Sequence, residues 1–156
     1  MTSKFSAKKT SIVIVLSEFN AIIIENLLQG ALDAFTHHGG NKSDIIIYRV
    51  PGAFEIPGTI AQVLKNHSPH AIVAIGAVIR GETPHFDFIA GESSRGISEL
   101  SRNSDIPIIN GIITTDTVQH ALDRSQPEGK NKGWEAMEAA LKTISVYDSM
   151  RTDSTC

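Results

Sequence analysis

Four short runs of apolar residues, each followed by a segment with helical spacing, constrain this chain more than any other feature. The runs are SIVIVL (11–16), DIIIYRV (44–50), AIVAIGAVI (71–79) and IPIINGIIT (106–114). Their apolar residues are mostly continuous, whereas a strand with one solvated face alternates apolar and polar residues. We therefore predict four strands buried on both faces, as in a parallel sheet that is covered by helices.

The segments that follow the runs have the spacing of amphipathic helices. Asn20 can serve as the N-cap of the first helix, and Gly39-Gly40 ends it. Pro57 lies in the first turn of the second, where a missing N–H costs least. Thr115 or Thr117 can cap a short fourth helix. Helices are expected at 18–38, 56–67, 85–103, 117–124 and 134–150. The predicted fold class is α/β, a three-layer α/β/α domain with right-handed crossovers.

A length of 156 residues suits a single domain, which we expect to span residues 11–150. Residues 1–10 are expected to form a flexible segment, and residues 151–156 a loose tail.

Neither a signal-peptide pattern nor the ~20 consecutive apolar residues of a membrane span are present. The net charge is -3 without a long basic run, so nucleic acid is a poor expected partner. Cys156 is the only cysteine, which excludes an intrachain disulfide and a cysteine-based zinc site. A cytoplasmic protein without a membrane partner is the simplest interpretation.

The functional groups concentrate where the predicted strands end. Ligands of open parallel sheets bind beyond the carboxyl ends of the strands. The segments at that edge are SEFN (17–20), PGAFE (51–55), RGETPH (80–85) and TTDT (114–117). We therefore expect the site at this edge.

The segment RGETPH combines the groups of an anion site with a proton carrier. Gly81 allows a sharp turn and the close approach of a ligand, and N–H groups that precede a helix attract an anion. Thr83 adds a hydroxyl donor, and His85 can move protons near neutral pH. The alternative is that the segment is only a turn and an N-cap, with His85 on the surface.

Aromatic rings occur at two neighbouring strand ends. Phe19 and Phe54 could hold a flat heterocycle between them, and Glu55 adds a carboxylate. Alternatively, both rings only pack under loops. Other polar clusters are less specific, because HH (37–38) and HSPH (67–70) lack a third metal ligand and GKNKG (129–133) lacks the spacing of a P-loop.

Together these segments resemble the lumazine synthase family of riboflavin biosynthesis. The resemblance extends from about residue 11 to about residue 149. It rests on VPGAFEIP (50–57), GAVIRGETPHFD (76–87), GIITT (111–115) and, after Arg124, NKG (131–133). Several separated motifs in the right order are more specific than any one of them. The resemblance implies a flavodoxin-like fold with a four-stranded parallel core sheet.

The resemblance implies a condensation that needs no metal and no organic cofactor. The small-molecule substrates would be 5-amino-6-(D-ribitylamino)uracil and 3,4-dihydroxy-2-butanone 4-phosphate, and the product 6,7-dimethyl-8-ribityllumazine. His85 would be the proton shuttle, because imine formation, phosphate elimination and ring closure all move protons. The resemblance further implies that Phe19 stacks on the pyrimidine, Ala53, Phe54 and Glu55 hold the ribityl chain, and Val78 and Ile79 meet the pyrimidine edge. Gly81, Glu82 and Thr83 would bind phosphate, Arg124 would pair with it, and Lys132 and Glu135 would flank the site.

Two residues depart from the family pattern. Many relatives have an aromatic residue where this chain has Asn110, at a position that faces the pyrimidine from the neighbouring subunit. Asparagine can hydrogen-bond the ring but cannot stack on it. Glu82 brings a carboxylate beside the expected phosphate, so we expect its side chain to point away while its N–H binds.

The family also implies a homo-oligomer, a pentamer or a multiple of pentamers, in which Arg124 of one subunit reaches the pocket of the next. Two further hypotheses stand beside the enzyme. One is a carrier that holds a lumazine or a flavin without turnover, which the presence of Asn110 favours. The other is a phosphate-binding α/β domain that acts on a different sugar phosphate.

Overall fold

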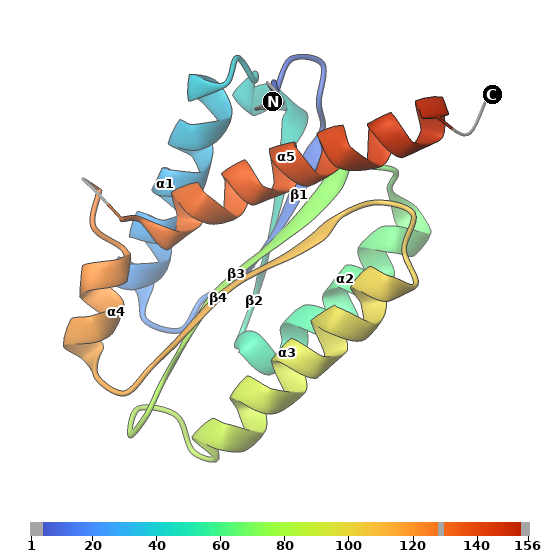
Figure 1. Ribbon diagram of the computed structural model, residues 1–156. Helices are drawn as coiled ribbons and strands as arrows, with labels where there is room; N and C mark the ends of the chain where they lie inside the picture. The colour runs from blue at the N-terminus through green and yellow to red at the C-terminus, as the bar shows by residue number, and fades with distance from the viewer. Residues whose placement is uncertain (1–4, 128–129, 154–156) are drawn as a thin grey trace.

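The computed structural model describes residues 5–127 and 130–153, and in it a four-stranded sheet lies between two layers of helices (Figure 1). The strands are β1 (Ile12–Ser17), β2 (Ile45–Val50), β3 (Ala71–Ile79) and β4 (Ile108–Thr115). They are all parallel, in the order β2-β1-β3-β4. The helices are α1 (Ala21–His37), α2 (Ile56–Asn66), α3 (Phe86–Arg102), α4 (Val118–Arg124) and α5 (Lys132–Asp153), with short 3-10 turns at Lys42–Asp44 and Ala53–Glu55. The predicted α/β fold is confirmed.

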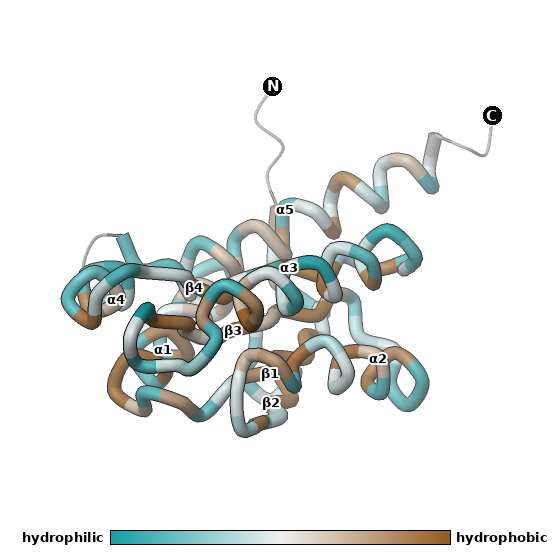
Figure 2. Tube along the Cα trace, turned by 90° about the horizontal axis from the view of Figure 1, so that it is seen from below, coloured by the Kyte–Doolittle hydropathy of each residue, from teal (hydrophilic) through white to brown (hydrophobic). Residues whose placement is uncertain are grey.

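Successive residues of the central strands point into two separate cores. On β1, Ile12, Ile14 and Leu16 pack with α1, α4 and α5, whereas Val13 and Val15 pack with α2 and α3. A strand alternates its side chains between two faces, so helices on both faces require apolar residues throughout. In Figure 2 the helices alternate between teal and brown turns, as amphipathic helices do when one side contacts a sheet.

The predicted helix ends are confirmed in part. Pro57 lies in the first turn of α2, and Gly39 follows α1 with a φ of 92°, in the left-handed region that glycine adopts readily. The Thr117 hydroxyl accepts a hydrogen bond from the backbone N–H of His120 and caps α4. Asn20 precedes α1 but has a φ of 62°, and its side chain makes no capping bond. A capping side chain reaches the first turn from an extended backbone, so the predicted cap is wrong.

Residues 5–10 and the last turns of α5 are described in the structure next to the two ends of the chain. Ala7 is fully buried, and its N–H donates to the carbonyl oxygen of His38 at 2.9 Å. The ring of Phe5 lies 4.7 Å from that of His38. Residues 5–10 therefore contact the end of α1 through Phe5 and Ala7, and the flexible segment expected over 1–10 stays a prediction. Helix α5 extends to Asp153, three residues beyond the expected domain end, and the rest of the expected tail (154–156) and residues 1–4 lie outside the described residues.

Candidate functional site

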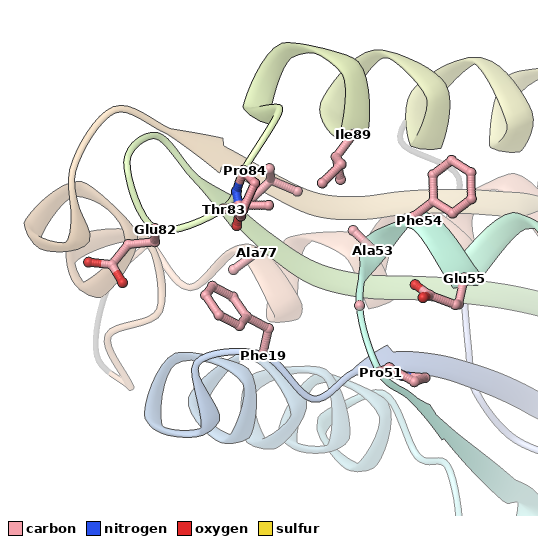
Figure 3. A pocket seen from close by; sticks show the side chains of 12 residues that line it. Phe19, Pro51, Ala53, Phe54, Glu55, Ala77, Glu82, Thr83, Pro84 and Ile89 are labelled. Atoms are coloured by element: carbon pink, nitrogen blue, oxygen red, sulfur yellow. The ribbon is translucent and has the colours of Figure 1, made fainter.

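A cavity of about 320 Å³ lies beyond the carboxyl ends of β1, β2 and β3, at the edge where the site was expected (Figure 3). This volume lies at the lower end of the range of small-molecule sites. Three of the four polar segments reach it. The predicted site residues among its lining are Phe19, Ala53, Phe54, Glu55, Val78, Glu82 and Thr83. Pro51, Gly52, Ala77, Pro84 and Ile89 complete the lining.

The aromatic rings do not form the expected sandwich. In Figure 3 the rings of Phe19 and Phe54 lie at different ends of the cavity. Phe54 instead stacks on Phe88 of α3, with ring centroids 6.1 Å apart and planes inclined by 22°. The 3-10 turn at Ala53–Glu55 carries the Phe54 ring toward α3, which explains the difference. The Phe19 ring, with 38% of its surface exposed, is available to a ligand at the other end of the cavity.

Glu55 brings a carboxylate to the cavity from the same 3-10 turn. Its N–H closes the turn by donating to the Gly52 carbonyl oxygen at 3.2 Å. Its carboxylate turns back over Gly52, where an added Cβ would lie 3.4 Å from Oε2. Among the described residues the carboxylate has no hydrogen-bond partner, so it is free to accept from a ligand that carries hydroxyl groups.

The loop after β3 turns at Gly81, whose φ is 86°. The N–H of Glu82 donates to the carbonyl oxygen of Ile79 at 3.1 Å and closes this turn. In this structure that N–H closes the turn, and the expected role of Glu82 in phosphate binding stays a prediction. The Glu82 carboxylate points away from Ala53 and Phe54, at one end of the cavity in Figure 3. The Thr83 side chain lies at the cavity wall and leaves its hydroxyl as a donor for an anion.

Arg80 holds this loop in place, a role that was not predicted. Its backbone N–H donates to the Thr115 carbonyl oxygen, and its side-chain Nε donates to the Asp116 carboxylate at 3.0 Å. Its guanidinium lies 4.4 Å from the centre of the Phe86 ring, at the start of α3. The hydrogen bond to Asp116 is the main cause that raises the pKa of Arg80 above its ordinary value, and Asp87 adds to it. A lone arginine before a glycine has no local spacing that signals such partners, so the sequence analysis missed it.

His85 is exposed and lies outside the cavity lining, between Pro84, which contributes to it, and α3. Its backbone has φ 58° and ψ 44°, and its carbonyl oxygen accepts from Ile89 N–H. Non-glycine residues rarely adopt this left-handed conformation, and they concentrate at functional sites. The loop thus places the His85 backbone directly after Pro84, which lines the cavity.

Six predicted site residues besides His85 lie away from the lining. Ile79 is fully buried at the end of β3, and Gly81 forms the turn after it. Asn110 is exposed on β4, where its Oδ1 accepts from the Ile112 N–H at 3.0 Å and its Nδ2 approaches the Ser94 hydroxyl at 3.4 Å. The remaining three are Arg124, whose Nη1 donates to the Thr114 carbonyl oxygen, and Lys132 and Glu135, which form an ion pair at 2.8 Å on α5.

Three histidines outside the loop have hydrogen-bonded or ion-paired structural partners. The His67 ring is 2.6 Å from the Tyr48 hydroxyl, His70 accepts from the Ser11 N–H, and His38 pairs with Glu138 at 2.7 Å. Within residues 5–127 and 130–153 no cluster of three or more metal-ligating side chains is found.

The comparison with known families agrees with the motifs around the cavity. A family model described as 6,7-dimethyl-8-ribityllumazine synthase matches residues 9–148. The chain belongs to this family.

Members of the 6,7-dimethyl-8-ribityllumazine synthase family from three bacteria are similar to this chain along most of their length. The proteins of Nitratidesulfovibrio vulgaris (strain DSM 19637 / Miyazaki F) and Chloroherpeton thalassium (strain ATCC 35110 / GB-78) are each 41% identical to it. The first alignment covers 94% of both chains, and the second 93% of this chain and 94% of the relative. The protein of Campylobacter jejuni subsp. doylei is 42% identical over 88% of this chain and 89% of its own.

In this member of the lumazine synthase family, the two longest motifs of the resemblance, 50–57 and 76–87, supply ten of the twelve residues that line the cavity. The other two are Phe19 and Ile89. In the described part of the chain, no helix is both long and apolar enough to cross a membrane.

Proposed function

We propose that the cavity beyond β1, β2 and β3 is where this chain carries out the reaction of its family. That reaction condenses 5-amino-6-(D-ribitylamino)uracil with 3,4-dihydroxy-2-butanone 4-phosphate, a transferase step of riboflavin biosynthesis that yields 6,7-dimethyl-8-ribityllumazine. The observation that carries the proposal is that two separate family motifs line a single cavity. Phosphate and water leave, and the chain's part is chiefly to position two reactants and move protons.

The pyrimidine is assigned to the part of the cavity beside Phe19, and the ribityl chain to the part beside the 3-10 turn at Ala53–Glu55. Phe19 offers an exposed ring for stacking, and the backbone at Val78 and Ile79 meets the pyrimidine edge. Ala53 and Phe54 border the ribityl chain, and the Glu55 carboxylate accepts from its hydroxyl groups. Glu55 suits this role because no described residue competes for its oxygens.

The phosphate is assigned to the loop after Gly81. Thr83 supplies a hydroxyl, and the backbone around Gly81 allows close approach. Glu82 lines the cavity beside this loop, and its backbone N–H, which closes the turn to Ile79, is the group proposed to face the phosphate. His85 takes and returns the protons of imine formation, phosphate elimination and ring closure. Its place in the sequence next to Pro84, which lines the cavity, supports this role.

The remaining site residues are assigned to a pocket that a neighbouring subunit completes. Asn110, Arg124, Lys132 and Glu135 lie outside the cavity lining within one chain. We propose a homopentamer or a multiple of pentamers, located in the cytoplasm, in which Arg124 of one subunit pairs with the phosphate bound by the next. Native mass spectrometry tests this assembly, and an active monomer would contradict it.

The direct test mixes the protein with both substrates and follows the lumazine product by fluorescence against a reaction without protein. We expect a rate well above that control. Phe19→Ala should raise the KM for the pyrimidine, whereas Ile22→Ala, which removes a side chain with 74% of its surface exposed outside the cavity, should not. A rate equal to the control together with tight flavin binding would instead indicate a carrier.

A further inference from the structure

One buried polar side chain outside the cavity joins three helices of the layer formed by α1, α4 and α5. Asn131 is only 3% exposed, at the start of α5. Its Nδ2 donates to the carbonyl oxygens of Asn26 in α1 and Ser125 after α4, each at 3.0 Å. Its Oδ1 accepts from the Trp134 N–H, also at 3.0 Å. Every donor and acceptor of the amide is thus used, and the orientation of the group is determined by its partners.

Two neighbouring glycines leave the space that this side chain occupies. A Cβ at Gly30 of α1 would collide with the Asn131 amide, and a Cβ at Gly133 would lie 3.0 Å from its Oδ1. Aspartate has the same shape but lacks both donors, and alanine lacks all three hydrogen bonds. Three satisfied hydrogen bonds in a buried site hold the linked segments strongly, because an unpaired buried carbonyl is costly.

The segment that Asn131 holds ends in Arg124. Helix α4 has only seven residues, too few to be stable without its contacts. Ser125, fully buried, follows Arg124 and bonds back to the Leu122 carbonyl oxygen through its N–H and its hydroxyl. The Ser125 carbonyl oxygen is then taken by Asn131. The Nη1 atom of the Arg124 side chain donates a hydrogen bond to the Thr114 carbonyl oxygen of β4.

We propose that Asn131 is a positioning residue for the reaction, which acts through Arg124 by fixing the end of α4 against α1 and α5. The inference rests on the proposed function, in which Arg124 pairs with the phosphate of the second substrate. Asn131 does not line the cavity beyond β1, β2 and β3. Asn131 bonds to the carbonyl oxygen of Ser125, the residue that follows Arg124. A guanidinium must meet a phosphate at a defined distance and angle, so we expect loss of Asn131 to weaken binding of the phosphate substrate specifically.

The experiment measures both KM values and kcat for Asn131→Ala, Asn131→Asp, Arg124→Ala and the double variant Asn131→Ala with Arg124→Ala, all in the full-length assembled protein. Leu141→Ala is the matched structural control, since it opens a space in a buried position of α5 and has no link to Arg124. Asn131→Asp preserves size and the bond to Trp134 and removes both donated bonds, so it tests those two bonds apart from the loss of the side chain.

Each Asn131 variant should raise the KM for the butanone phosphate about tenfold or more, as expected when a binding group is displaced. The KM for the pyrimidine should change less than about twofold, and Leu141→Ala should leave both KM values near those of the parent protein. In the Arg124→Ala background the further effect of Asn131→Ala should disappear, because the residue through which it acts is gone.

Two results would overturn the inference. An equal rise of both KM values, or the same loss with and without Arg124, would make Asn131 a purely structural residue. If Arg124→Ala alone leaves the KM for the butanone phosphate unchanged, the assignment of Arg124 fails and the inference with it. The single Arg124 variant therefore separates a failure of the proposed function from a failure of the inference.

Discussion

The Nη1 atom of Arg124 donates a hydrogen bond to the carbonyl oxygen of Thr114 at 3.2 Å. This contact ties the last residue of α4 to the end of β4, yet the guanidinium remains exposed and keeps its other donors for an anion. Arginine offers five donors in a planar fork, and one bond to a carbonyl leaves a pair that matches two phosphate oxygens.

Arg124→Lys tests whether this fork matters beyond its charge. Lysine keeps the positive charge but presents only a point charge on a flexible chain. We expect the KM for the butanone phosphate to rise about tenfold with Arg124→Lys, and kcat to change less. Steady-state kinetics with each substrate varied in turn measures this split. A KM for the pyrimidine that rises equally would show that Arg124 has a structural role instead.

Replacement of His85 should slow turnover without weakening binding. Loss of a general acid–base group costs about 10²-fold or more in rate. The left-handed backbone of His85 requires a control that tolerates the same conformation, which asparagine does better than alanine. We expect His85→Asn to lower kcat as much as His85→Ala while it leaves both KM values within a few-fold. Unchanged turnover in His85→Asn would remove the imidazole from the mechanism.

Asn110→Phe should remove one hydrogen bond within the chain and add an aromatic ring at position 110. The Asn110 Oδ1 accepts from the Ile112 N–H at the outer edge of β4, the last strand of the sheet. A phenylalanine loses that bond, at a cost of about 1 kcal/mol in folding stability. If the residue faces the pyrimidine of the next subunit, a stacked ring should lower the KM for the pyrimidine about threefold.

Asn110→Ala is the control for this exchange, because it removes the bond and adds no ring. It should lower the thermal stability as much as Asn110→Phe does, and it should not lower the KM. Equal KM values in the two variants would mean that position 110 does not face the pyrimidine.

Gly133→Ala should destabilise the packing of α5 on α1. A Cβ at this position would collide with the carbonyl oxygen of Leu27, a backbone atom that cannot rotate away. Forcing the helices apart should cost about 2 kcal/mol or more. Thermal unfolding measures the loss. Gly58→Ala in α2, where a Cβ meets no atom within 4 Å, should instead preserve or raise the stability by up to about 1 kcal/mol. A Gly133→Ala variant as stable as Gly58→Ala would contradict the close contact.

Local patterns predicted the elements because their causes are local. The continuous apolar runs of β1 and β3 indicated burial on both faces, and the residues of both strands do divide between two cores. Thr117 was one of two candidate caps, and the structure selects it because its hydroxyl reaches His120, whereas the Thr115 hydroxyl donates to the Thr117 carbonyl oxygen. Asn20 failed as a cap because residue type alone does not reveal a left-handed backbone.

The sequence by itself determined the α/β class, the family and the edge of the sheet that bears the cavity, since these follow from periodicity and from motifs within short segments. Only the tertiary structure decided that Phe54 stacks on Phe88, that the Glu82 N–H is already engaged, and that Asn131 bonds to Asn26 across 105 positions of the chain. Such contacts depend on how closely packed elements approach one another and which backbone groups remain unpaired. Those quantities arise only when distant segments meet, and spacing along the chain does not contain them.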